Sequence, residues 1–233
     1  MVKKSPAQKT IAKKAPIKKS SVKKPTKQQA PKLLPYGNAD FRRLRTQNCI
    51  YVDKTRFIEL LESESNNNSK IFIRPRRFGK SLFLSTLSYY YDINYKNEFD
   101  LLFGDLYIGQ HPTQRRNSYA VMGFNFSGID TSSADDVKTS FFNNIRNTIC
   151  RFLDKHENIF PDAANVCNQI NNLDYPALEA LDWVFRIADK AGIKIFVIID
   201  EYDHFANDLI AKDSISGDEL YKTIVAVNGF VRD

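Results

Sequence analysis

Residues 70–81 read KIFIRPRRFGKS, and this stretch decides the fold. Its first four residues are mostly apolar and predict a short strand over Lys70–Ile73. From Ser81 to Tyr91, leucines and aromatic residues are dense enough to predict a buried helix. A basic loop that ends in Gly79 and Lys80 stands between the two. The order of strand, loop and helix indicates a loop that delivers its last residues to a helix N-terminus.

The last three residues of this stretch, 79–81, match the end of a phosphate-binding loop, or Walker A motif. In that motif backbone N–H groups and the helix N-terminus face phosphate oxygens, the lysine adds a positive charge, and the serine hydroxyl coordinates Mg²⁺. The full motif asks for glycine where Arg74 stands, and the neighbouring Pro75 has no N–H to donate. We therefore expect this loop to hold phosphate with fewer backbone donors than the general motif.

Arginines in the loop offer a compensation, because guanidinium groups bind phosphate oxygens in pairs and stay charged. The alternative is that they are solvated loop side chains. The residues expected to bind the nucleotide are Arg76, Arg77, Phe78, Gly79, Lys80 and Ser81. Ser81 is also expected to be a metal ligand.

A second motif lies at residues 195–201, which read IFVIIDE. The apolar run is typical of a strand covered on both faces in a parallel sheet. The two acids at its end resemble a Walker B segment, in which Asp200 would hold Mg²⁺ through water and Glu201 would orient and deprotonate the attacking water. A core strand that ends in a solvated acidic turn is the alternative for this segment alone. The pair of motifs in this order favours nucleotide binding.

Strand and helix patterns alternate along the rest of the chain. A strand is expected at 119–126, a helix at about 134–156 and another at about 176–190, where Gly192 follows as a left-handed C-terminal residue. Residues 51–62 predict an extended piece that runs into a helix. This alternation predicts an α/β fold, a three-layer P-loop NTPase sandwich around a parallel sheet.

The basic character of the chain belongs to its N-terminus. The formal net charge is +7, but residues 1–32 hold 11 lysines and no acidic residue, and the other 23 basic residues face 27 acidic ones. The tail has no aromatic residue and is expected to be disordered, with the folded domain at 33–233. Its lysines could bind DNA or RNA phosphates without sequence preference, and a solubilising extension is the alternative.

Cysteine usage and hydropathy favour a cytoplasmic protein. Cys49, Cys150 and Cys167 are odd in number and lack the spacing of a disulfide framework or a zinc site. The longest apolar run, 195–199, is far below the roughly 18 residues that a membrane span needs. Neither a secretory leader nor a membrane segment is predicted.

Three separated signatures together resemble the AAA-ATPase-like family: the run YVDKT at 51–55, the loop RPRRFGKS at 74–81 and the strand end IDEYD at 199–203. The resemblance covers about residues 34–208, and the arginine-rich loop is similar to that family's usual form. It implies binding of ATP and Mg²⁺ at Lys80, Ser81 and Asp200, with Glu201 as the base. Family members commonly continue into a nuclease-like domain.

In AAA-type sheets the strand after the Walker B strand inserts between the Walker A and Walker B strands, and this chain stops at Asp233 before it. The resemblance therefore implies a partial domain, whose strands at 71–73 and 195–199 would expose unpaired backbone and apolar surface. The chain is then either a gene fragment or one that needs a partner chain to complete the sheet.

Three functions follow: an ATPase acting on nucleic acid or a protein, a nucleotide-binding or nucleic-acid-tethering module without turnover, and an inactive remnant. The sequence does not decide the oligomeric state.

Overall fold

The computed structural model describes residues 32–63, 69–73, 75, 77–171, 177–202 and 204. Within them, two strands form a parallel sheet, β1 (Tyr119–Asn125) and β2 (Lys194–Asp200). The register pairs Tyr119 with Lys194 at one end and Asn125 with Asp200 at the other. A long helical crossover joins the two strands, because parallel neighbours cannot be linked by a tight turn.

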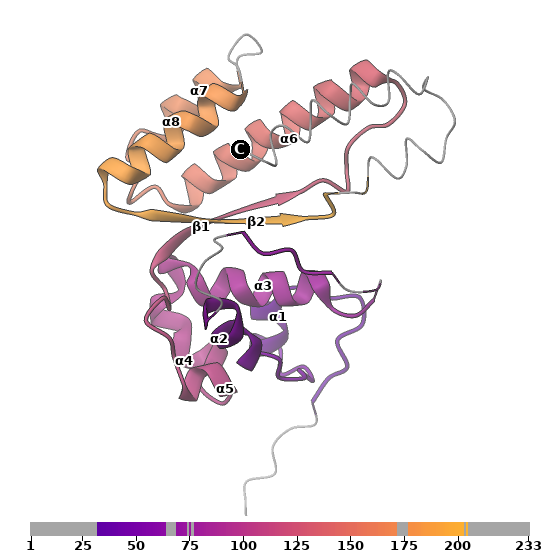
Figure 1. The fold of residues 1–233 in the computed structure, drawn as a ribbon, viewed down its shortest axis with the longest axis vertical. Helices are drawn as coiled ribbons and strands as arrows, with labels where there is room; N and C mark the ends of the chain where they lie inside the picture. Colours follow the sequence, from indigo (N-terminus) through magenta and orange to yellow (C-terminus); the bar gives the residue numbers. More distant parts are fainter. Residues whose placement is uncertain are drawn as a thin grey trace, which may run out of the picture. The chain divides into compact units, whose positions relative to one another are not determined.

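One face of this sheet is covered by α6 (Ala134–Lys155), α7 (Ala163–Ile170) and α8 (Ala177–Lys190), as Figure 1 shows. The side chain of Ser133 caps α6 by accepting the N–H of Asp136 at 3.2 Å. Two aspartates in the first turn and Lys155 in the last suit the helix dipole. Along α6, Phe141, Ile145 and Ile149 recur every fourth residue and are all buried against β1.

The other face is covered by α3 (Lys80–Tyr91), behind which lies α1 (Phe41–Thr46) in Figure 1. The remaining elements on this side are α2 (Arg56–Ser63), the 3₁₀ helix η1 (Ile93–Glu98), α4 (Phe99–Phe103) and α5 (Tyr107–Gln110). Side chains alternate along β1, so that Met122 enters the core under α6 whereas Val121 enters the core under α3.

A buried charged cluster joins the two helical layers near the start of β1. The carboxylate of Asp92 is fully buried; its Oδ2 lies 2.6 Å from the ammonium of Lys155, and its Oδ1 lies 3.2 Å from Nε2 of His156. Asp92 follows α3, whereas its two partners stand at the end of α6. The cluster therefore ties the helix on one face of the sheet to a helix on the other.

The prediction of a strand at 70–73 is wrong, since no strand forms there. Residues 69–73 have no regular secondary structure, and Ile71 and Ile73 are 79% and 82% exposed. Only Phe72 makes a ring contact, with Phe83 of α3 at 5.2 Å. β2 is also less covered than expected, since Val197 is 41% exposed. Apolar composition alone does not make a strand, because a strand also needs hydrogen bonds from a neighbouring strand.

The α/β class is confirmed by these elements. In the described part of the chain, five predicted elements are present with bounds that agree within one or two residues: 81–91, 119–126, 134–156, 176–190 and 194–199. The lysine tail at 1–31, Arg76 and residues 205–233 lie outside the described residues. Among the helices that the structure describes, none is long and apolar enough to cross a membrane.

Candidate functional site

The loop before α3 ends in a tight turn. The N–H of Phe78 donates to the carbonyl of Pro75 at 3.4 Å, and Gly79 adopts a left-handed conformation with φ of 78° and ψ of 31°. Glycine reaches this region without the clash that a Cβ atom causes. The turn delivers the chain directly into the first residue of α3, which is Lys80.

The N-terminus of α3 begins with an N-cap residue that has no side chain, Gly79. In the described part of the chain no side-chain cap is present there, and the first turn contains no acidic residue. The first N–H groups of a helix have no partners within it, and the helix dipole adds partial positive charge there. Lys80 and Ser81, both half-buried, lie in this first turn. This end of α3 suits an anion such as phosphate.

The two acids stand where β2 ends. Asp200 is the last residue of the strand, and its Oδ1 accepts the N–H of Glu201 at 3.0 Å. The carbonyl of Asp200 accepts the N–H of Phe126 at 3.2 Å, which fixes the strand end against the residue that follows β1. Both carboxylates are half-buried. They are hard oxygen donors of the kind that Mg²⁺ prefers.

The acids and the loop lie at the same end of the sheet. The last residue of α3, Tyr91, stacks on Phe196 near the start of β2 at 4.5 Å and meets Tyr119, the first residue of β1, at 5.7 Å. Because the end of α3 lies at the start of both strands, its N-terminus lies toward their carboxyl ends, where both strand arrows in Figure 1 point. Ligands bind at this end of open α/β sheets.

Backbone strain is concentrated in the same residues. Four residues other than glycine have positive φ among those described, Asn48, Asn117, Arg77 and Glu201. Asparagine tolerates this region, but arginine and glutamate do so at a cost of about 1–2 kcal/mol. The two costly positions, with φ of 67° and 54°, are both residues that the sequence singled out. Strain of this kind is often kept at functional sites.

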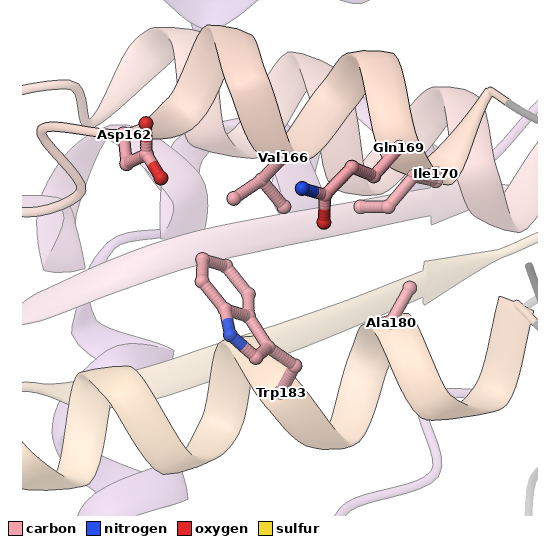
Figure 2. Close-up of a pocket in the computed structure, with 6 residues that line it drawn as sticks. All are labelled: Asp162, Val166, Gln169, Ile170, Ala180 and Trp183. Atoms are coloured by element: carbon pink, nitrogen blue, oxygen red, sulfur yellow. The ribbon is translucent and has the colours of Figure 1, made fainter.

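The pocket drawn in Figure 2 is separate from the residues at the N-terminus of α3 and the end of β2. It lies between α7 and α8, where Val166 and Trp183 face each other, and its volume is about 110 Å³. Its lining residues are Asp162, Val166, Gln169, Ile170, Ala180 and Trp183. Ligand pockets usually have about 300–1,000 Å³, so this one is too small for a nucleotide. It also lies in the helical layer that does not contain the phosphate loop.

Ser81 and Asp200 are the residues expected to hold a magnesium ion. The described residues contain no group of three or more histidine, cysteine or acidic side chains that could hold a metal ion together. Mg²⁺ differs from most metals in keeping several waters and in needing only one or two protein oxygens when phosphate supplies others. The hydroxyl of Ser81 and the carboxylate of Asp200 fit that requirement by their chemistry.

Comparison with protein families decides the affiliation. A family model described as predicted AAA-ATPase, the AAA-ATPase-like family, matches residues 35–232. The chain belongs to this family. No curated protein and no solved structure matches it. Membership in the AAA-ATPase-like family supports nucleotide binding in general, and the match extends the likeness seen at 34–208 as far as residue 232.

The YVDKT run at 51–55 belongs to the signature that resembles the AAA-ATPase-like family. From the sequence, Asp53 or Thr55 is expected to cap the following helix, and no site residue is predicted in the run. In the structure Asp53 and Thr55 bond to the backbone of α5, which lies more than 50 residues later in the chain. The composition of the run does not predict these contacts with α5, which are seen only in the structure.

Proposed function

We propose that this chain binds ATP with Mg²⁺ at the N-terminus of α3 and hydrolyses it. The observation that carries the proposal is the helix N-terminus after the left-handed Gly79, which no described side chain caps. It is directed to the sheet end where β2 presents Asp200 and Glu201. Membership in the AAA-ATPase-like family makes ATP the expected nucleotide. The positive φ angles of Arg77 and Glu201 also support a functional site here. Strained backbone conformations are often retained at functional sites although they cost stability.

In this proposal each residue has a distinct task. Lys80 binds phosphate oxygens as a cation, and the first N–H groups of α3 donate to the same anion. Ser81 and Asp200 hold Mg²⁺, which when bound neutralises charge on the phosphate oxygens. Arg76, Arg77 and Phe78 line the loop around the nucleotide. The N–H of Glu201 orients one oxygen of Asp200, and the Glu201 carboxylate accepts a proton from water.

The proposal also extends to the domain organisation. Residues 33–233 would be part of a P-loop sandwich whose sheet gains a further strand between 71–73 and β2, where Ile71, Ile73 and Val197 are now exposed. Residues 1–32 would be a disordered tail that contacts nucleic-acid phosphates, and the protein would act in the cytoplasm.

Titration of ATP into the protein in the presence of Mg²⁺ tests the binding step. We expect Lys80→Ala to weaken the ATP Kd by at least about 10-fold, because it removes a charged hydrogen bond to phosphate. Lys96→Ala removes an exposed lysine from η1, beyond the opposite end of α3, and should leave the Kd unchanged. An unchanged Kd in Lys80→Ala would contradict the whole proposal.

Phosphate release tests the second step. Glu201→Gln keeps the size of the side chain but cannot take a proton, so we expect kcat to fall by about 100-fold or more while ATP still binds. If wild type and Glu201→Gln release phosphate at the same background rate, hydrolysis is excluded and binding alone stands.

A nucleotide-binding module without turnover is the second candidate, and one observation favours it. The N–H of Phe78 is engaged by the carbonyl of Pro75, and Pro75 itself has no N–H. The engaged N–H of Phe78 and the missing N–H of Pro75 leave the loop with fewer backbone donors. Fewer donors can then stabilise the charge on a transferring phosphoryl group. ATP binding with no release above background would be the result that selects this candidate.

A further inference from the structure

The tripeptide 53–55 is anchored on both sides of its central residue. One carboxylate oxygen of Asp53 accepts the N–H and the hydroxyl of Thr55 at 2.8 and 2.6 Å, and the other accepts the N–H of Tyr107 at 2.8 Å. Burial alone would raise the pKa of Asp53, but these hydrogen bonds outweigh it and lower the pKa. Asp53 is therefore a fixed carboxylate.

Thr55 provides the second anchor. It is fully buried, and its hydroxyl oxygen accepts the N–H of Ile108 at 3.1 Å. The backbone of Lys54 is held as well, since its carbonyl accepts the N–H of Phe57 in the first turn of α2. With both neighbours bonded to α5, the position of the Lys54 backbone is defined by contacts that do not involve its own side chain.

The side chain of Lys54 reaches the phosphate loop. Its ammonium lies 3.5 Å from the carbonyl oxygen of Phe78, at the outer limit of a hydrogen bond. A Cβ atom added to Gly79 would lie 4.0 Å from the same ammonium. An ammonium has three N–H donors, and within the described residues Lys54 has no ion pair with a carboxylate. An exposed cation thus stands at the glycine that precedes α3, and no carboxylate of the described residues neutralises it.

We propose that Lys54 is a second phosphate-binding lysine, which contacts the phosphate group held at the N-terminus of α3. This inference rests on the proposed function and adds a residue to that site. It gives the YVDKT run a purpose: Asp53 and Thr55 position the backbone so that the lysine between them meets the loop. It also supplies a charge in a loop where Pro75 donates no N–H.

A purely mechanical role is the competing explanation, in which Lys54 only braces the loop through the carbonyl of Phe78. Two substitutions separate the roles. Lys54→Gln keeps an N–H donor for that carbonyl but loses the charge, whereas Lys54→Arg keeps the charge. If Lys54 only braces the loop, its role requires an N–H donor for the carbonyl of Phe78. If Lys54 binds phosphate, its role requires the positive charge.

The experiment compares the affinity of the full chain for ATP and for adenosine, both in the presence of Mg²⁺. We expect Lys54→Gln to weaken ATP binding by roughly 10-fold, and to leave adenosine binding unchanged. Lys54→Arg should retain ATP affinity within about 3-fold. ATP binding by Lys54→Gln should also depend less on ionic strength, because one screened attraction has been removed.

Arg56→Gln is the matched control. Arg56 is the next cation along the chain, and its guanidinium lies over the ring of Phe57 at 5.2 Å instead of at the loop. We expect its ATP Kd to equal that of wild type. Circular dichroism of each variant checks that the fold is kept.

The outcomes distinguish this inference from the proposed function. If Lys80→Ala weakens ATP binding and Lys54→Gln does not, the role of Lys54 is overturned and the nucleotide site stands. Equal losses for ATP and adenosine in Lys54→Gln also overturn it, because they indicate a general disturbance of the loop. If wild type binds no ATP, or Lys80→Ala binds as well as wild type, both proposals fail together.

Discussion

The two faces of the β1–β2 sheet both bury aliphatic and aromatic side chains, but the face under α3 also places three tyrosines against polar groups. Under α6, α7 and α8 the buried cluster consists of aliphatic and phenyl side chains and a cysteine. Under α3 three consecutive tyrosines bond to polar groups of surrounding segments: Tyr89 to Asp40, Tyr90 to Thr113 and Tyr91 to Glu62, at 2.9–3.0 Å. Apolar burial stabilises without direction, whereas these hydrogen bonds fix the segments around α3 in position. The first face supports the fold, and the second holds the candidate site.

The largest loss of stability is expected on the apolar face. Phe141 is 2% exposed and stacks on Phe126 at 5.1 Å. Phe141→Ala should lower the free energy of unfolding by about 4 kcal/mol, because it removes a buried ring and leaves a cavity. Urea unfolding followed by circular dichroism measures this. Phe185→Ala, at a position 39% exposed on α8, should cost far less, and equal losses would contradict the packing described here.

The next largest effect is expected where the two faces are joined. Asp92→Asn should cost about 3 kcal/mol at neutral pH, since it leaves the ammonium of Lys155 and the buried ring of His156 without their carboxylate partner. Asp182→Asn breaks an exposed ion pair with Arg186 on α8 and serves as the control, for which we expect little change. Unfolding curves that coincide for the two variants would show that the cluster contributes nothing.

The same cluster predicts a pH dependence. Burial alone would raise the pKa of Asp92, but hydrogen bonds from His156 and Asn94 and the charge of Lys155 outweigh it and lower the pKa below its ordinary value of 3.8. The carboxylate therefore contributes stability above this value and loses it as the pH falls through the lower pKa of the folded state. Urea titrations between pH 6 and pH 3 should show a steeper loss for wild type than for Asp92→Asn.

A smaller loss is expected on the tyrosine face. Tyr91→Phe leaves a carboxylate oxygen of Glu62 without this donor and should cost about 1.5 kcal/mol. Burial and the charge of Glu62 raise the pKa of Tyr91 above its ordinary value of 10.0. The contribution of the Tyr91 hydroxyl to the free energy of unfolding is then complete below pH 10. It is lost as the pH rises through the pKa of the folded state. Urea unfolding at pH 7 and pH 11 tests both statements, with the exposed Tyr107→Phe as control.

The smallest effect should have the opposite sign. Arg77→Gly and Glu201→Gly relieve positive φ angles, and each should raise the free energy of unfolding by about 1 kcal/mol. In the proposed site the same substitutions should impair nucleotide binding or turnover.

Gly192→Ala is the control and should have the opposite sign. It introduces a Cβ atom at a φ of 67° with open space around it and should lower the free energy of unfolding by about 1 kcal/mol. Thermal unfolding measures all three, and destabilised Arg77→Gly and Glu201→Gly would refute stored strain.

Local periodicity was sufficient to predict the elements that bury an apolar face. The apolar repeat of α6, the dense apolar residues of α3 and the apolar run of β2 all gave the right element within one or two residues. The segment 70–73 has the same composition as a strand but is not assigned as one, and the pairing that makes a strand is not encoded in a local window. For the same reason the sequence named Lys80 and Asp200 but not Lys54, whose significance depends on Asp53 meeting Tyr107 far along the chain.

The parallel register of the sheet has a consequence for how the chain reaches its native state. Tyr119 pairs with Lys194, so β1 is synthesised well before β2 exists, and its hydrogen-bonding edge stays without β2 until α6, α7 and α8 have been made. Contacts between residues so distant in sequence form slowly, because a long loop must close before any of them is gained. We expect the acids at the end of β2 to reach the α3 N-terminus in a late step of folding.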